Sequence, residues 1–251
     1  MITRVTYGAP VETFAVVQDI PVSGHEALRR FYRKKGQPQI FSCPLGADDV
    51  IYGLGETMRG INKRGYRYIS FNYDDPHHKD DMPSMYGAHN FFVVDGEEAF
   101  GAFFDTPAKV TFDMDSKGTG VLSVICESAD LRLYIVEGGS VYEVVREFLG
   151  AIGQSFLPPL WAFGYGQSRW GYRTERDISR VASRHQALGI PLDYICMDID
   201  YMDRYIDFTV NKRRFPDMAG YAARMKEQGI HLVPIVDAGI KIEPGNTVYD
   251  E

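Results

Sequence analysis

The spacing of apolar positions differs between the two halves of the chain. As far as about Leu133, short β-branched and aromatic runs alternate with Gly, Pro, Asp and Asn, which is typical of strands joined by turns. Four clear runs cover residues 90–94, 99–104, 121–126 and 131–136. Asp95-Gly96 between the first two indicates a hairpin, and Glu97 and Glu98 lengthen its loop. Many short strands at this spacing predict an antiparallel β-sandwich.

A helix and a proline pair follow the strand-like half. Ser140 and Glu143 have the spacing of a capping box. Four apolar residues then share one helical face: Val141, Val144, Val145 and Phe148. Pro158-Pro159 prevents a helix from continuing. We therefore expect a sandwich domain over residues 1–157, with a linking helix near 140–150, and a second domain over residues 158–251.

After Pro159 the pattern becomes one of strands alternating with helices. Apolar runs predict three strands, at 161–167, 192–197 and 231–236. One helix between them is predicted to begin at the N-cap Thr174 and to end at Gly189, and the other to begin at Asp217 and to end at Gly229. Their apolar stripes are Ile178, Val181, Ala182 and Leu188, and Met218, Tyr221, Ala222 and Met225. This order predicts parallel βαβ units, in either a doubly wound sheet or a (β/α)8 barrel.

Functional residues of parallel α/β folds gather at the carboxyl ends of the strands. Asp198 and Asp200 follow the second predicted strand and would point to the same side of an extended chain. A carboxylate there can accept hydrogen bonds from several sugar hydroxyls, or one of the pair can cap a loop or bind an arginine. A metal site of Asp198, Asp200 and Asp203 is a weaker alternative, because the segment lacks the spacing of an EF-hand.

Two other strand ends carry candidate side chains. Trp170 follows the first predicted strand and can form an apolar wall for a sugar ring, or can fill the core instead. Asp237 follows the third strand and places another carboxylate at the same edge. In the first half, the adjacent His77 and His78 lie in a charged segment that we interpret as a solvated loop.

Composition excludes several classes of protein. The 251 residues are 45% apolar, which is too high for a disordered chain, and carry a net charge of −7 without the basic patch that nucleic acids require. No apolar run has the length of a membrane span, and the first residues do not read as a signal peptide. The three cysteines, Cys43, Cys126 and Cys196, suit buried thiols of a reducing compartment, so we expect a soluble cytoplasmic protein. The Gly-x-Gly segments lack the third glycine of a dinucleotide-binding loop.

Several motifs in order resemble glycoside hydrolase family 31. They lie at residues 52–56, 167–172, 197–202, 207–209, 215–217 and 235–239. The resemblance covers nearly the whole chain and is greatest to the bacterial intracellular α-glucosidases of the family. It implies an all-β N-terminal sandwich followed by the first part of an α/β (β/α)8 TIM barrel, with about three barrel strands present.

The resemblance also implies an activity and a set of site residues. It implies a retaining α-glucosidase that removes terminal non-reducing α-linked glucose from small oligosaccharides such as maltose or isomaltose, without a cofactor or a metal. The positions that match substrate-binding residues are Asp74, Trp170, Asp198, Ile199 and Ile235. Of these, Asp198 would bind sugar hydroxyls and Asp74 would reach the pocket from a sandwich loop. Asp200 and Asp203 would be structural.

The sequence departs from the family at the catalytic residues. The family's nucleophile lies in a Trp-x-Asp-Met-Asn-Glu-like segment and its acid/base lies further on, whereas Trp161 and Trp170 are the only tryptophans here. We therefore expect both catalytic aspartates beyond Glu251. The 251-residue chain by itself is predicted to be inactive. One alternative is a non-catalytic sugar-binding module. Another is an interaction module, such as a homo-oligomer, that pairs through its open sheet, because three strands cannot close a barrel of eight.

Overall fold

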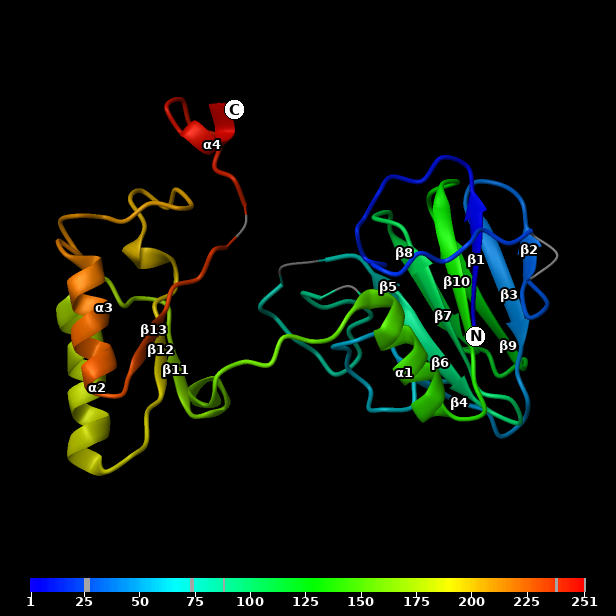
Figure 1. Cartoon of the computed structure of the whole chain (residues 1–251), viewed down its shortest axis with the longest axis horizontal. Helices are drawn as coiled ribbons and strands as arrows, with labels where there is room; N and C mark the ends of the chain where they lie inside the picture. Colours follow the sequence, from blue (N-terminus) through cyan, green and yellow to red (C-terminus); the bar gives the residue numbers. More distant parts are fainter. Residues whose placement is uncertain (25–27, 73–74, 88, 238, 251) are drawn as a thin grey trace. The chain divides into compact units, whose positions relative to one another are not determined.

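The chain forms two compact units, Met1–Ser155 and Phe156–Glu251 (Figure 1). The computed structural model describes residues 1–24, 28–72, 75–87, 89–237 and 239–250.

The first unit consists of two five-stranded antiparallel sheets. One has the order β1-β10-β7-β6-β4, with bounds Ile2–Tyr7, Leu131–Glu137, Phe100–Asp105, Phe91–Asp95 and Val50–Gly53. The other has the order β2-β3-β9-β8-β5, with bounds Tyr32–Lys34, Gln39–Pro44, Val121–Cys126, Val110–Met114 and Arg67–Ser70. The predicted sandwich is confirmed, and the four strands named from the sequence correspond to β6, β7, β9 and β10 within one residue at each end.

Alternating side chains of both sheets form the core of the sandwich. Phe41 and Phe112 come from one sheet, Phe104 comes from the other, and all three side chains are fully buried. The ring centroid of Phe104 lies 5.4 Å from that of Phe41 and 6.1 Å from that of Phe112, both in edge-to-face geometry. Such aromatic contacts add to the burial of apolar area that holds the two sheets together.

The β6–β7 connection is the predicted hairpin with a lengthened loop. Val94 pairs with Phe100 in antiparallel register, so residues 95–99 make the turn. Glu98 in this loop contacts Arg30 at 2.7 Å. The hairpin loop therefore lies against the segment that precedes β2.

Helix α1 (Val141–Ile152) packs on the first unit. The Ser140 side chain accepts a hydrogen bond from the Glu143 amide at 3.3 Å, as expected, but the Glu143 carboxylate accepts from the Gly139 amide at 2.8 Å and not from Ser140. Phe148 stacks on Phe91 with a centroid distance of 3.7 Å. Val145, expected on the same apolar face as Val144, is 37% exposed and lies outside the cluster formed around Val144.

The second unit is a three-stranded parallel sheet in the order β11-β12-β13. The strands are Gly166–Ser168, Tyr194–Cys196 and His231–Val233, and the helices between them are α2 (Glu175–Leu188) and α3 (Met218–Glu227). Both helices lie on the same face of the sheet (Figure 1). Sequential strands with helices on one face are the beginning of a (β/α)8 barrel, because a doubly wound sheet carries helices on both faces. A short helix, α4 (Thr247–Asp250), follows.

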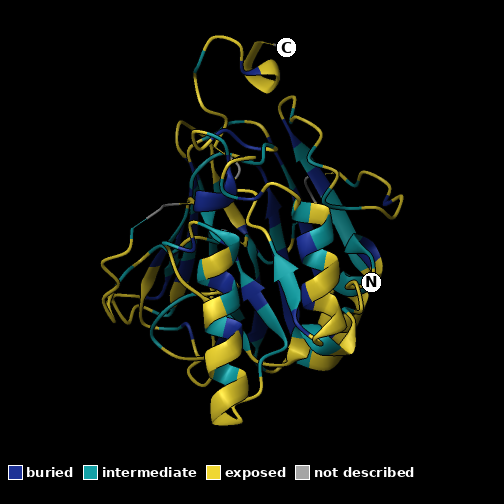
Figure 2. Ribbon diagram, turned by 90° about the vertical axis from the view of Figure 1, so that its left-hand side faces the viewer, coloured by how far each residue is buried: buried dark blue, intermediate teal, exposed yellow. Residues whose placement is uncertain are grey.

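Both barrel helices begin and end close to where the sequence predicts. The Thr174 hydroxyl accepts from the Asp177 amide at 3.3 Å, and Gly189 ends α2 with a left-handed φ of 64°. The Asp217 carboxylate accepts from the Gly220 amide at 3.0 Å. The outer faces of the two helices are exposed (Figure 2). Of the predicted apolar stripe of α2, Ile178 is fully buried, whereas Leu188 in the last turn is 67% exposed.

The first predicted barrel strand is partly wrong. Residues Leu160–Phe163 form a 3-10 helix, in which the Ala162 amide donates to the Pro159 carbonyl at 2.9 Å. The strand begins only at Gly166 and is short. Trp161 stacks on His231 at 4.0 Å, so its apolar ring packs against β13 without belonging to a strand. Among the described residues, no helix is long and apolar enough to cross a membrane.

Candidate functional site

The carboxyl ends of β11, β12 and β13 meet at one edge of the parallel sheet. Ser168, Cys196 and Val233 end the three strands and stand opposite one another in the register. The segments that follow carry four of the residues predicted to bind substrate: Trp170, Asp198, Ile199 and Ile235. Parallel pairing therefore brings segments about thirty residues apart in sequence to the same edge of the sheet.

Asp198 lies at the point where the chain leaves β12. Its backbone has a φ of 57° and a ψ of −159°, and its carboxylate Oδ1 accepts from the Ile199 amide at 2.8 Å. A 3-10 helix, Ile199–Tyr201, begins directly afterwards. Asp198 and Asp200 were expected to point to the same side if the strand stayed extended between them. This expectation is wrong, because the chain turns into the 3-10 helix directly after Asp198. The half-buried Asp198 and the buried Asp200 therefore do not stand on one face of a strand.

Asp200 has partners within its own loop. Its side chain is 3% exposed, Oδ1 lies 3.5 Å from Nη1 of Arg214, and the Tyr205 hydroxyl donates to it at 3.2 Å. Arg214 Nη1 also donates to the Asp200 carbonyl at 2.9 Å. This carboxylate fastens residues 200–214 to one another, which is the structural role expected of it.

The three aspartates of this loop do not gather around a common point. Asp203 has a half-exposed carboxylate near Arg204, and its amide donates to the Thr209 hydroxyl at 2.9 Å. Within the part of the chain that the structure describes, no three His, Cys, Asp or Glu side chains are placed to hold a metal ion. The alternative of a metal site formed by Asp198, Asp200 and Asp203 is therefore not supported.

Apolar side chains flank Asp198 on the neighbouring strand ends. Trp170 is 70% exposed, so its ring does not fill the core of the unit. Ile235 is 40% exposed. An exposed indole and an exposed aliphatic side chain at the ends of parallel strands can offer apolar surface to a ligand.

Tyr201 is a residue of this region that sequence reasoning missed. Its hydroxyl donates to the Ile235 carbonyl at 2.8 Å, which links the segment after β12 to the segment after β13. Burial and, less strongly, the charge of Asp207 raise the pKa of Tyr201, so the hydroxyl keeps its proton and remains a donor. The only sequence signal was a tyrosine next to the aspartate pair, because the partner lies 34 residues away.

The remaining predicted site residue, Asp74, lies outside the described residues. Nearby, His77 and His78 are exposed, which confirms the interpretation of a solvated loop. The His77 amide donates to Asp75 Oδ1 at 2.9 Å, and this hydrogen bond is the main cause that holds the pKa of Asp75 below its usual value.

Two family models match most of the sequence. The glycosyl hydrolases family 31 TIM-barrel domain matches residues 155–251. The glycosyl hydrolase 31 N-terminal galactose mutarotase-like domain matches residues 24–113. The two matches fall on the barrel unit and on the sandwich.

Individual relatives agree with these matches. Alpha-glucosidase 2 of Bacillus thermoamyloliquefaciens is 36% identical over 206 residues, covering 81% of this chain and 26% of the relative. An alpha-glucosidase of Saccharolobus solfataricus is 27% identical over 244 residues, covering 96% of this chain and 35% of the relative. A Flavobacterium johnsoniae family 31 dextranase complexed with isomaltotriose superposes with a TM-score of 0.73 at 24% identity. The superposition covers 82% of this chain and 25% of the dextranase. The chain thus spans about a quarter to a third of the length of these relatives.

Proposed function

Because the chain belongs to glycoside hydrolase family 31, we propose that it supplies part of the glucose-binding site of an α-glucosidase. One observation carries this proposal: the ends of three adjacent parallel strands bring Trp170, Asp198 and Ile235 to one edge. The α-glucosidases among its relatives support the choice of α-linked glucose as substrate.

The local geometry of Asp198 fits the binding of sugar hydroxyls. Its Oδ1 already accepts from the Ile199 amide, and this bond fixes the orientation of the carboxylate. A carboxylate offers about four lone pairs, so both oxygens retain capacity for hydroxyl donors. Trp170 and Ile235 would contact the apolar faces of the same ring, and Ile199 would line the pocket beside Asp198.

We propose that the complete enzyme acts with retention on the terminal glucose of small α-glucosides such as maltose or isomaltose. Retention requires two carboxyl groups roughly 5 Å apart, one attacking the anomeric carbon and one protonating the leaving oxygen. The family's nucleophile segment does not occur in these 251 residues. The chain would therefore bind and orient glucose, and the reacting carboxylates would come from residues outside this sequence.

Hydrolysis assays test the first consequence of this assignment. The purified chain should release no glucose from maltose, isomaltose or an aryl α-glucoside above a protein-free blank. Turnover that co-purifies with the chain would contradict the proposal, because it would require a catalytic pair within these residues.

A chimaera tests the positive part. This chain replaces the matching residues of the Bacillus relative, and folding is checked by circular dichroism. The chimaera should hydrolyse the aryl α-glucoside, and Asp198→Ala should abolish that activity while Asp203→Ala, at a half-exposed aspartate five positions along, leaves it. A folded chimaera that is equally active with Asp198→Ala would contradict the role of Asp198.

The exposure of Trp170 and Ile235 in the chain itself favours one second candidate, a non-catalytic sugar-binding module. Half of a pocket should bind glucose poorly, since the opposite wall is missing. Calorimetric titration with glucose separates the two proposals: millimolar or tighter binding that Asp198→Ala removes favours the binding module. Absence of such binding favours the enzyme.

We also propose a reducing compartment, the cytoplasm, for this protein. All three cysteines are free, and burial raises the pKa of Cys43 to about 11 and that of Cys126 to about 12. Buried, protonated thiols persist where disulfides do not form.

A further inference from the structure

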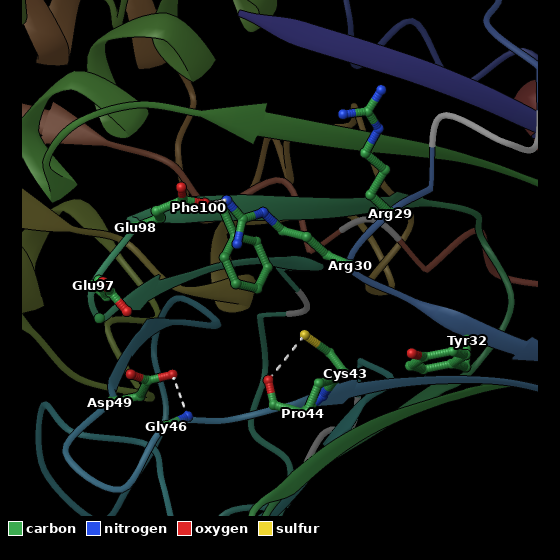
Figure 3. A pocket seen from close by; sticks show the side chains of 11 residues that line it. Arg29, Arg30, Tyr32, Cys43, Pro44, Gly46, Asp49, Glu97, Glu98 and Phe100 are labelled. Carbon is green, nitrogen blue, oxygen red and sulfur yellow. Dashed lines mark hydrogen bonds and ion pairs between the residues drawn. The ribbon is translucent and has the colours of Figure 1, made fainter.

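The sandwich carries a cleft that the proposed function does not use. Its volume is about 460 Å³, within the range of ~300–1,000 Å³ typical of small-molecule sites. The end of β3, the turn before β4, the β6–β7 hairpin loop and β2 surround it (Figure 3). All of its walls come from the first unit.

The side chain at the centre of this cleft is held in place. The Arg30 guanidinium donates to Glu98 at 2.7 Å and lies 4.7 Å above the centre of the Phe100 ring. A second carboxylate, that of Glu137, lies 3.7 Å from Arg30 Nε. The guanidinium is thus fixed by two carboxylates and an aromatic face, and a ligand meets it already oriented.

Other lining residues of the cleft supply hydrogen-bond acceptors and an uncharged thiol. Asp49 is held by the Gly46 amide at 2.9 Å, and Glu97 stands beside it (Figure 3). Cys43 forms the floor, and burial raises the pKa of its thiol to about 11, so the floor adds no charge at neutral pH. Donor groups and acceptor groups therefore face the same space.

The balance of charge selects the class of ligand. Three carboxylates line the cleft, those of Asp49, Glu97 and Glu98, against the guanidiniums of Arg29 and Arg30. Because side chains of both signs face the cleft, neither a simple anion nor a simple cation is complementary to the whole lining, and an apolar ligand would desolvate both kinds of charge. A neutral molecule rich in hydroxyls can donate to the carboxylates and accept from arginine at once.

Tyr32 adds an aromatic surface at the rim. It is 75% exposed, and its hydroxyl is directed toward the middle of the cleft in Figure 3. Phe100 cannot offer its face, because it is buried and Arg30 covers it. Tyr32 is therefore the ring on which the C–H face of a sugar can stack.

We propose that this cleft is a second saccharide site, binding a neutral oligosaccharide between Tyr32, Arg30 and the carboxylates of Asp49 and Glu97. It is independent of Asp198 and does not rest on the proposed α-glucosidase activity. Its function would be to hold the protein on an oligosaccharide without reaction.

Titration of the ¹⁵N-labelled chain with maltotriose tests the proposal, with inorganic phosphate as a parallel arm. Maltotriose should shift the amide signals of Tyr32, Gly46 and Glu97 with a millimolar midpoint, and phosphate should not. Shifts with phosphate alone would indicate an anion site and overturn the proposal. Absence of shifts with maltotriose at these residues would overturn it as well.

Matched variants identify the surface that binds. Tyr32→Ala should weaken maltotriose binding about five-fold, whereas Tyr142→Ala on α1, at a tyrosine exposed to 73%, should not change it. Glu97→Gln should also weaken binding, because it removes a charged acceptor. Asp203→Ala, at a half-exposed aspartate of the second unit, should leave the midpoint of these three amide signals unchanged. Equal losses of affinity with Tyr32→Ala and Tyr142→Ala, or a loss with Asp203→Ala, would contradict a separate site on the sandwich.

Discussion

Single buried carboxylates show how far a residue can be understood from its neighbours in the sequence. Asp200 follows Asp198 in a pattern that suggests a pair on one strand face, but the left-handed backbone of Asp198 separates them. Asp200 is bound instead by Arg214, fourteen residues further on, a partner that sequence spacing does not reveal. The position of Asp198 at a strand end was predictable from the order of apolar runs. The contact between Tyr201 and the Ile235 carbonyl was not, because it joins two loops across the sheet.

Asp115 in the sandwich gives a prediction at this scale. Its side chain is 3% exposed, Arg64 Nη2 contacts Oδ2 at 3.2 Å, and the Gly120 amide donates to Oδ1 at 3.0 Å. Burial alone would raise the pKa of Asp115, but the hydrogen bonds from Arg64 and from backbone amides outweigh it and lower the pKa. A lowered pKa in the folded state means that the ionised form stabilises folding above pH ~4, and that this stabilisation is lost as the pH falls below that value.

Asp115→Asn should therefore lower the free energy of unfolding of the sandwich by about 2 kcal/mol at pH 7. The difference in free energy of unfolding between the variant and the unaltered chain should shrink toward pH 3. Urea unfolding at several pH values measures it. The matched control is Asp113→Asn, a half-buried aspartate on the same turn whose Oδ1 accepts from Ser116. A loss of unfolding free energy that stays constant with pH would show that ionised Asp115 is not the stabilising species.

At the scale of elements, the sequence predicts helices well and short barrel strands poorly. The N-caps Ser140, Thr174 and Asp217 all accept from amides of their first turns, because capping is a local interaction that the sequence contains. The first part of the run after Pro159 forms a 3-10 helix instead of a strand. A short apolar run fits a strand and a helical turn equally well, and the contact that Trp161 of this run makes with His231 lies far away in the sequence.

Two glycines, one inside α1 and one directly after it, give opposite predictions for the same substitution. Gly150 lies in the exposed interior of the helix, and an added Cβ would meet nothing within 4 Å. Gly150→Ala should stabilise the sandwich by about 0.5–1 kcal/mol, since alanine loses less entropy in a helix. Gly153 follows the helix with a φ of 91°, so Gly153→Ala should destabilise by about 1 kcal/mol through backbone strain.

Thermal unfolding of both variants beside the unaltered chain measures the two effects. The contrast is informative because a Cβ on Gly153 would make only an ordinary contact with Val17 at 3.6 Å, so crowding does not explain a loss. Equal shifts of the two midpoints would contradict the explanation from backbone conformation.

At the scale of the molecule, the order of pattern types along the chain was enough to predict two architectures. Alternating short strands became a sandwich, and alternating strands and helices became βα units. The choice between a doubly wound sheet and a barrel needed the side on which α2 and α3 lie, which apolar periodicity does not specify. Family motifs supplied that choice from the sequence, and the arrangement of the helices agrees with it.

The two units should differ in how they behave when separated. The sheets of residues 1–155 cover one another's apolar faces and share a core of their own. In residues 156–251, β11 and β13 are edge strands among the described residues, and large apolar side chains such as Leu160, 88% exposed, lie at the surface. Open strand edges and exposed apolar groups promote association.

Residues 1–155 should therefore unfold in one cooperative transition and remain monomeric, whereas residues 156–251 should associate as their concentration rises. Circular dichroism and light scattering on the two separately produced segments measure this. Leu160→Lys should reduce association of the second segment without loss of helix signal, because Leu160 contributes nothing to the core around Ile178 and Phe215. A second segment that stays monomeric at all concentrations would show that its edges are protected by the segment itself, and an open sheet would then not be available to a partner.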